Sequence, residues 1–252
     1  MSGLTRLDGK VAIVTGAAGG MGQAIGRLLG ERGATVVLTD KDPAVLELEG
    51  GFGPDALALT HDVTSVDDAM GVVARVRERF GRLDVLVNNA GWDRPSLFAD
   101  SDPADWLRIV QINYLGVVTG SYAALPLLRE APDGGAIVSI ASDTARVGGW
   151  GEAVYAGAKA GVVAFSKSLA REVARDRIRV NCVSPAVTQT AFQDRLAADP
   201  IGAKIVEGAI RSAPMRRAAV PEEIAEAVAF MASPAAGFIT GQVLSVNGGV
   251  VM

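Results

Sequence analysis

Residues 10–22 read KVAIVTGAAGGMG, a short apolar run followed by a glycine-rich turn. Residues 10–15 have the length and composition of a strand that is buried on both faces. A helix is expected to follow over about 21–32. Glycines at positions 16, 20 and 22 let the backbone turn tightly and approach a pyrophosphate, whose charge is favoured by the free N–H groups at a helix start. The stretch therefore predicts a dinucleotide site between the first strand and the first helix.

This glycine turn departs from the G-x-G-x-x-G fingerprint, because Ile25 occupies the last glycine position. A glycine-rich turn can also be no more than a tight connection between two elements. Its place between a strand and a helix favours the cofactor interpretation over that simpler one.

Strand-like and helix-like segments alternate along the rest of the chain, which is typical of a parallel sheet with helices on both faces. We therefore predict one α/β domain over residues 1–252, a Rossmann-type, doubly wound, seven-stranded parallel sheet. Residues 186–220 have no regular strand pattern, and we expect a long irregular insertion at the carboxyl edge of the sheet. We interpret it as a substrate lid, although a surface excursion is the alternative. The remaining strand patterns are 35–40, 56–63, 83–91, 135–142, 177–184 and 242–249, and the remaining helical patterns are 65–80, 103–111, 114–129, a run from about 152, and 221–232.

Composition excludes several classes of protein. The 252 residues are 49% hydrophobic and 21% charged, which suits one globular domain, and the net charge of −4 leaves no basic footprint for nucleic acid. The first ten residues lack the apolar core of a signal peptide and no apolar run reaches about 20 residues, so we expect a cytoplasmic protein without a membrane partner. A single cysteine, Cys182, and a single histidine, His61, argue against a disulfide, a multi-histidine metal site and a Ser-His-Asp hydrolase.

Acidic residues follow two of the predicted strands. Asp40 lies about twenty residues beyond the glycines, where a carboxylate accepts hydrogen bonds from the adenosine ribose and repels a 2′-phosphate. It therefore favours NAD over NADP, although a turn or helix-cap role is the alternative and Lys41 weakens the argument. Asp62 follows the next strand, where it could meet the adenine amino group, cap the next helix, or do both.

Polar residues also follow the central strands. Asn88 and Asn89 end the fourth strand and are expected to stabilise the turn and line the crevice in which α/β ligands bind. Asn113 lies at the junction of two helical patterns, where it could hold a water in an interrupted helix or merely form a cap. Ser142 ends the fifth strand and should enter the same crevice.

Tyr155 and Lys159 stand four residues apart in a predicted helix, so both project from one face. Tyrosine has an ordinary pKa of about 10 and must be shifted by roughly 2–3 units to act as a base near neutral pH. An ammonium at about 4 Å supplies about 4 kcal/mol at an effective dielectric near 20, which is the required size. We therefore expect Lys159 to hold Tyr155 near its phenolate, although Y-x-x-x-K alone also occurs on solvated helices.

Together TGAAGGMG, Asp62, NNAG, Asn113, Ser142 and Tyr155-x-x-x-Lys159 resemble the short-chain dehydrogenase/reductase family across the whole chain. The resemblance implies a catalytic tetrad of Asn113, Ser142, Tyr155 and Lys159. It departs from the usual pattern at Pro185-Ala186, where the family has Pro-Gly. The cofactor-binding residues that we predict are Gly16, Gly20, Met21, Gly22, Asp40, Asp62, Val63, Asn89, Ala90, Gly91, Tyr155, Lys159, Pro185, Thr188 and Thr190.

These residues predict an NAD-dependent oxidoreductase that interconverts a secondary alcohol and a ketone. Tyr155 exchanges the hydroxyl proton, Ser142 binds the substrate oxygen and hydride passes to the nicotinamide. The alternatives are an NADPH-dependent 3-oxoacyl-acyl-carrier-protein reductase, against which Asp40 stands, and a non-catalytic nucleotide-binding protein, against which the intact tetrad stands.

Four large side chains in the loops are expected at the mouth of the pocket, although each could simply pack its loop or face solvent. Indole faces suit an apolar ring, and arginines suit a carboxylate or phosphate. The segments around them resemble 2-hydroxycyclohexanecarboxyl-CoA dehydrogenases, which implies a cyclic or β-hydroxyacyl-CoA substrate. The four pocket residues are Trp92, Arg94, Arg146 and Trp150.

The helices at 114–129 and 152–175 carry more apolar surface than packing on one sheet face needs. Such surface indicates an interface between copies, and the family resemblance adds the expectation of a homotetramer.

Overall fold

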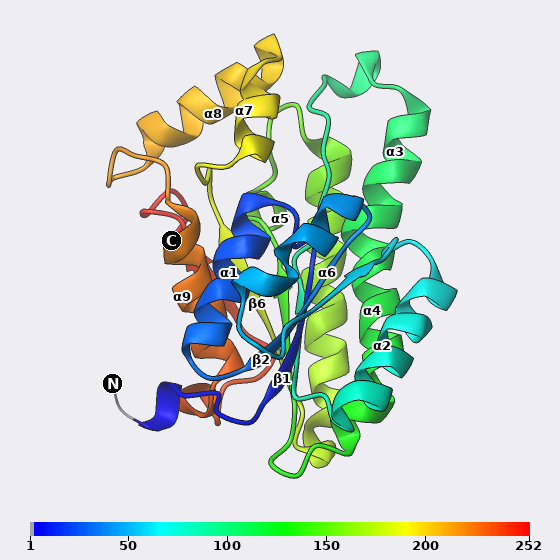
Figure 1. Ribbon diagram of the computed structural model, residues 1–252. Helices are drawn as coiled ribbons and strands as arrows, with labels where there is room; N and C mark the ends of the chain where they lie inside the picture. Colours follow the sequence, from blue (N-terminus) through cyan, green and yellow to red (C-terminus); the bar gives the residue numbers. More distant parts are fainter. Residues whose placement is uncertain (1–2) are drawn as a thin grey trace.

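A single parallel sheet lies at the centre of residues 3–252, which the computed structural model describes (Figure 1). Its seven strands have the order β3-β2-β1-β4-β5-β6-β7, and all neighbours are parallel. The predicted fold class is therefore confirmed. The strands are β1 (Val11–Thr15), β2 (Thr35–Asp40), β3 (Leu57–Thr60), β4 (Val85–Asn88), β5 (Ala136–Ile140), β6 (Arg179–Pro185) and β7 (Val243–Val246).

The strand order reverses between β1 and β4. The chain moves outward from β1 through β2 to β3, and then returns to β4 and continues to β7 on the other side. Val14 of β1 accordingly pairs with Leu38 on one side and Val87 on the other. Strands that part in this way leave a crevice beyond their carboxyl ends, where ligands of open α/β sheets bind. The glycine turn after β1 and the NNAG turn after β4 both lie at this point.

Helices cover both faces of the sheet, as the alternation of segments predicts. The five main ones are α1 (Gly20–Glu31), α2 (Val66–Phe80), α4 (Gly116–Arg129), α6 (Ala153–Val173) and α9 (Pro221–Ala232). In Figure 1, α1 and α9 lie on one face, and α2, α4 and α6 lie on the other. Ile25 and Val228 belong to the buried cluster of the first face, whereas Val76 and Leu127 belong to that of the second. These two buried clusters hold the helices on both faces of the sheet and so position its carboxyl edge, where the site lies.

Short elements complete the chain. Within residues 3–252, no helix is both long and apolar enough to cross a membrane. The short helices are α3 (Pro103–Val110), a π-helical turn (Gln111–Leu115), α5 (Thr144–Val147) and 3₁₀ helices at Gly3–Thr5, Pro43–Gly51, Phe98–Asp100, Ala174–Asp176 and Pro234–Ala236.

The segment 186–220 differs from the expectation of an irregular insertion, because it contains α7 (Ala191–Ala197) and α8 (Pro200–Ser212). Thr190 caps α7 by accepting a hydrogen bond from Gln193 N. Asp199 caps α8, with proline at the first helical position. Both starts follow ordinary capping chemistry. Side chains of this segment line the cleft, as the lid interpretation requires.

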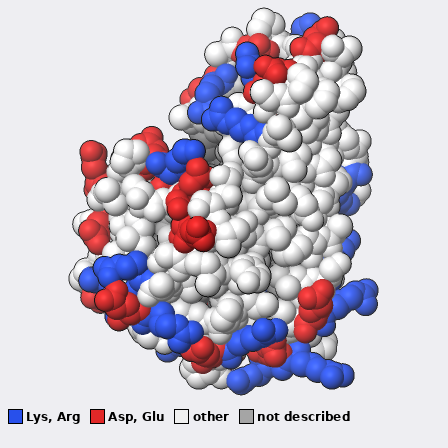
Figure 2. Space-filling view, turned by 90° about the vertical axis from the view of Figure 1, so that its right-hand side faces the viewer, with Lys and Arg blue, Asp and Glu red and all other residues white. Residues whose placement is uncertain are grey.

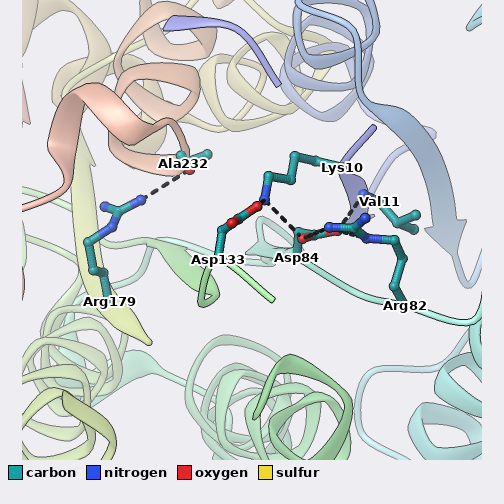
Figure 3. A network of polar contacts seen from close by, with 7 residues as sticks. All are labelled: Lys10, Val11, Arg82, Asp84, Asp133, Arg179 and Ala232. Atoms are coloured by element: carbon teal, nitrogen blue, oxygen red, sulfur yellow. Dashed lines mark hydrogen bonds and ion pairs between the residues drawn. The ribbon is translucent and has the colours of Figure 1, made fainter. Parts of the chain in front are cut away.

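The amino edge of the sheet is held by Asp84, whose side chain is 2% exposed (Figure 3). Its carboxylate accepts a hydrogen bond from Val11 N at 2.9 Å and two from the Arg82 guanidinium at 2.9 and 2.7 Å. The Lys10 ammonium lies 3.4 Å from Asp84 Oδ1 and 2.7 Å from an Asp133 oxygen. One buried carboxylate therefore joins the start of β1 to the start of β4.

Candidate active site

The carboxyl ends of the central strands open into a cleft of about 1090 Å³. Ser142, Tyr155 and Lys159 line it, whereas Asn113 lies behind its wall. The structure therefore brings the expected cofactor and catalytic residues to one place, and their roles stay predictions. Residues of the predicted cofactor set that line the cleft are Gly16, Gly20, Met21, Gly22, Asp40, Asp62, Val63, Asn89, Ala90, Gly91, Tyr155, Lys159, Pro185, Thr188 and Thr190.

Two glycines of the turn, Gly16 and Gly22, have no room for a side chain. Gly16 has a φ of 66°, and a Cβ there would lie 2.7 Å from Ala90 Cα. A Cβ on Gly22 would lie 2.3 Å from the Gly16 carbonyl oxygen. Asn89 Nδ2 donates to the carbonyl oxygen of Thr15 at 2.8 Å, and the Thr15 hydroxyl accepts from the backbone N–H of Asn89 at 3.0 Å and of Ala90 at 3.1 Å. The two turns are thereby fixed against each other.

The two asparagines of the NNAG turn have different places. Asn89 lines the cleft, as expected. Asn88 instead is 4% exposed in the core, where its amide donates to Ser121 and Ser139 hydroxyls at 3.4 and 3.3 Å. The expectation that both would line the crevice is wrong, because hydroxyl acceptors from α4 and β5 satisfy Asn88 inside the protein.

Acidic groups gather where β2 and β3 end. Asp40 accepts hydrogen bonds from Ala18 N at 2.9 Å and Asp42 N at 3.0 Å, which fixes its carboxylate beside the glycine turn. Lys41 binds Asp62 at 2.6 Å, and this hydrogen bond is the main reason that the pKa of Asp62 falls to about 2. Asp62 does not cap α2, since Ser65 does so in the described chain.

Asn113 lies in the π-helical turn Gln111–Leu115 and is 0% exposed. Its Nδ2 donates to the carbonyl oxygens of Trp92 at 2.6 Å and Ile109 at 3.0 Å, and its Oδ1 accepts from Trp92 N at 3.3 Å. A π-turn is common at functional sites. The interrupted helix expected from the sequence is therefore present, and its amide holds the loop that follows β4.

Ser142, Tyr155 and Lys159 come together from β5 and α6. Ser142 Oγ accepts from Thr144 Oγ1 at 3.0 Å and also hydrogen-bonds the Tyr155 side chain. The Lys159 ammonium is 2% exposed and donates to the Ile140 carbonyl oxygen at 2.7 Å. Because Oγ accepts from Thr144, its one proton is left for Tyr155, or for a substrate oxygen that takes this place.

The expected effect of Lys159 on Tyr155 is wrong in this structure. Burial, followed by the charges of Glu152 and Asp93, raises the pKa of Tyr155, and the hydrogen bond with Ser142 opposes this. Lys159 Nζ lies 5.7 Å from the centre of the tyrosine ring, and burial lowers its own pKa to about 8. Burial, with a smaller contribution from the two acidic neighbours, therefore raises the pKa of Tyr155, and the ammonium over the ring does not offset it. Tyr155 is a neutral phenol here, which suits it to donate a proton.

Asp93 and Glu152 are lining residues that the sequence interpretation missed. Burial raises the pKa of both carboxyls to about 7. The available signals were local: Asp93 comes two residues after NNAG, and Glu152 lies three residues before Tyr155. Such positions suggest proximity to the site but not burial, so they did not single out these residues.

The four expected substrate residues separate. Trp92 lines the cleft, and the Arg108 guanidinium lies 4.0 Å from its ring centre. In the described chain the other three residues do not line the cleft. The prediction that they lie at the mouth of the pocket is corrected accordingly. Arg94 pairs with Asp105 at 3.3 Å, Arg146 donates to Ser245 at 2.8 Å, and Trp150 is 56% exposed beside Lys204.

The residues present fit a dinucleotide cofactor. The helix α1 begins with Gly19 as its N-cap, so no side chain covers the first N–H groups, which favour an anion. Asp40 lines the cleft beside the glycine turn, where it could accept from a ribose, and Lys159 lines it together with Ser142 and Tyr155. A nicotinamide cofactor bound there would supply hydride chemistry beside Ser142 and Tyr155.

The chain matches a family model described as Enoyl-(Acyl carrier protein) reductase over residues 16–251. Among its curated relatives is the 3-oxoacyl-[acyl-carrier-protein] reductase FabG of Thermotoga maritima, which is 37% identical over 253 residues, covering 98% of this chain and 100% of that protein. The protein of the same name from Escherichia coli is 38% identical over 246 residues, covering 97% and 98%.

Solved structures show the same likeness. A protein described as short-chain dehydrogenase/reductase SDR:glucose/ribitol dehydrogenase, from Brucella melitensis, has a TM-score of 0.90 and 36% identity, and covers 98% of each chain. Levodione reductase has a TM-score of 0.90 and 31% identity, covering 97% of this chain and 98% of that one. The likeness therefore extends over almost the whole fold.

Proposed function

The chain belongs to the short-chain dehydrogenase/reductase family of oxidoreductases, and on this premise we propose that it reduces the ketone of a 3-oxoacyl thioester with NADH. The observation that carries the proposal is one cleft with two halves. The glycine turn and Asp40 form a cofactor half, and Ser142, Tyr155 and Lys159 form a catalytic half. The names of the relatives support the 3-oxoacyl class, which the sequence interpretation had placed second.

The proposed mechanism assigns one task to each residue of the catalytic half. The Ser142 hydroxyl donates to the ketone oxygen, and the Tyr155 phenol transfers its proton to that oxygen as the alcohol forms. The bound nicotinamide supplies the hydride. The buried Lys159 ammonium orients the cofactor ribose, and Asn113 keeps the wall of the site in place through Trp92. In the reverse direction Tyr155 removes the proton.

The direct test is the NADH-dependent reduction of acetoacetyl-CoA and of acetoacetyl-acyl-carrier protein. The rate of each reaction is measured as the loss of NADH absorbance. Turnover of either thioester supports the proposal, and the comparison identifies the carrier. A second candidate is a cyclic secondary alcohol with NAD, which the indole of Trp92 in the cleft favours. Turnover of cyclohexanol derivatives without turnover of either thioester would replace the first proposal with the second.

The contacts around Asp40 support NADH over NADPH. A 2′-phosphate bound beside Asp40 would meet a carboxylate that two backbone N–H groups hold in place. The nearest cation along the chain, Lys41, is already engaged by Asp62 at 2.6 Å. It therefore offsets the repulsion only in part.

We expect Asp40→Ala to narrow the preference for NADH over NADPH by about tenfold in kcat/KM, because it removes the like charge. The control is Asp55→Ala, which removes an exposed carboxylate that does not line the cleft. This control should leave the ratio unchanged. Equal efficiencies with the two cofactors in the wild type would refute the role of Asp40.

Residues 186–220 are proposed to act as the substrate lid. Thr188, Thr190 and Phe192 line the cleft from this segment, as do Ile205 and Val206 of α8. Loops and helices that border a cleft in this way can exclude water during the reaction.

We likewise propose a cytoplasmic location, as expected for an enzyme of small metabolites.

A homotetramer is proposed from the outer face of α4 and α6. Figure 2 shows one side of the molecule on which charged side chains gather at the edges and leave a broad uncharged centre. Leu115 is 44% and Tyr122 is 68% exposed, and α6 exposes the small residues Ala153, Gly157 and Ala164. Such a face suits close helix packing between copies.

Light scattering should therefore report four chains of 26.0 kDa, and Tyr122→Arg should split the assembly by placing a charge in the contact. Met70→Arg on α2 is the control, since Met70 is 45% exposed on another helix. A wild-type monomer would contradict the proposal, as would equal effects of the two substitutions.

A further inference from the structure

Two acidic side chains enter the catalytic half of the cleft from different elements. Asp93 lies in the loop after β4, and Glu152 immediately precedes α6. The charges of both act on Tyr155, which places them around the reacting group. Neither forms an ion pair within the part of the chain that the structure describes. They are acidic groups without a dedicated cation.

Asp93 is the more deeply buried of the two. It is 5% exposed, and its Oδ2 has no hydrogen-bond partner among the described residues. Its carboxyl is near Lys159 and Asp105, and it accepts a hydrogen bond from the Arg94 backbone N–H. A buried polar atom left unpaired destabilises the folded protein. Packing therefore does not explain Asp93, whereas a ligand in the cleft that contacts Oδ2 would.

We propose that the Asp93–Glu152 pair binds the second carbonyl oxygen of a β-dicarbonyl substrate by donating a hydrogen bond to it. Ser142 and Tyr155 hold the ketone that is reduced, so the pair selects substrates with a second carbonyl two carbons away. The inference rests on the proposed function for the ketone position. It also means that the subsite rejects a substrate with a carboxylate at that place, because like charges repel.

The protonation of the pair agrees with a donor role. Burial raises the pKa of each carboxyl to about 7, and Asp93 adds to the rise at Glu152. Below pH 7 the acids are mainly protonated and can donate, as a buried acid does when its site keeps it neutral. Above pH 7 they ionise and lose the donor. The groups that face the pair are Lys159, Tyr155 and, at Asp93, also Asp105.

The experiment compares ethyl acetoacetate, which has both carbonyls without a carrier, with 2-pentanone, which has one. The values of kcat/KM with NADH are measured from about pH 6 to 9, together with those for acetoacetyl-CoA. The wild type should prefer ethyl acetoacetate, and the preference should fall as pH rises through about 7. Lys159 also titrates near 8, so the comparison between variants, rather than the wild-type profile alone, is decisive.

Amide and apolar variants separate donation from shape. The double variant Asp93→Asn/Glu152→Gln keeps N–H donors at all pH values, so the preference should persist and no longer depend on pH. The double variant Asp93→Leu/Glu152→Leu removes both donors and should lower the preference about tenfold. Glu172→Gln, an exposed acid on the same helix, is the control and should match the wild type. NADH binding, measured by fluorescence, verifies that each variant is folded.

The two proposals can fail separately. If acetoacetyl-CoA is reduced but the preference for ethyl acetoacetate is absent, the subsite is overturned and the function stands. The same conclusion follows if the double leucine variant keeps the preference, or if the double amide variant keeps its dependence on pH. If acetoacetyl-CoA is not reduced while the preference exists and follows the variants as described, the thioester function is overturned and the subsite stands.

Discussion

Replacing Tyr155 with phenylalanine should lower turnover about a thousandfold and leave NADH binding intact. The change removes one hydroxyl that hydrogen-bonds Ser142, and leaves the ring beneath the Lys159 ammonium. Because Tyr155 is a neutral phenol in this site, the lost group is the proton donor for ketone reduction. Steady-state kinetics with acetoacetyl-CoA and NADH fluorescence titration would measure the two effects.

Tyr114→Phe is the matched control, because Tyr114 belongs to the π-helical turn and lies outside the lining of the cleft in the described chain. It should retain turnover. Ser142→Ala should lower turnover as well, since the substrate oxygen loses a donor. If Tyr155→Phe lost NADH binding together with turnover, or kept most of its turnover, Tyr155 would not be the acid.

Strand and helix positions were predictable where local chemistry and packing agree. The helix expected at 221–232 is α9, Pro221–Ala232, because proline at its start, acidic residues in its first turn and an apolar face all indicate the same element. Buried strands such as β1 and β5 follow from short runs of valine and isoleucine. In these segments every level of the sequence favours one structure.

The segment 186–220 shows where this agreement ends. α7 has only 7 residues, too few to show a helical period. α8 has 13 residues and is as amphipathic as α1, and it begins with the Asp199 cap and a proline, so its start signals and its apolar pattern are both present in the sequence. The expectation of an irregular insertion was therefore wrong.

Residues of the site were predictable by type and place, but their electrostatics were not. The cleft gathers every predicted cofactor residue, because strand ends meet at one edge of the sheet. The pKa of Tyr155 instead depends on Asp93 and Glu152, which come from separate segments. Arg146 similarly has a partner in β7, Ser245, that lies 99 residues away. Such distances arise only from the three-dimensional fold.

The largest loss of stability is expected at the opposite edge of the sheet, on Asp84 (Figure 3). Its carboxylate satisfies the Val11 N–H and a bidentate Arg82, with Lys10 nearby, and its side chain is 2% exposed. Removing it leaves a backbone N–H of β1 without its acceptor and two cations without their shared anion. Losing one member of a buried charge network costs more than the network contributes net.

We therefore expect Asp84→Ala to lower the free energy of unfolding by roughly 3 kcal/mol, as measured by urea denaturation. Asp133→Ala is the matched control, because Asp133 binds the same Lys10 but its side chain is 75% exposed, so the lost pair should have little effect. Asp84→Asn should fall between them, since its amide oxygen still accepts from Val11 N. The two variants differ chiefly in the solvent exposure of the anion that they remove. Equal losses in the free energy of unfolding for Asp84→Ala and Asp133→Ala would therefore mean that burial does not strengthen this network.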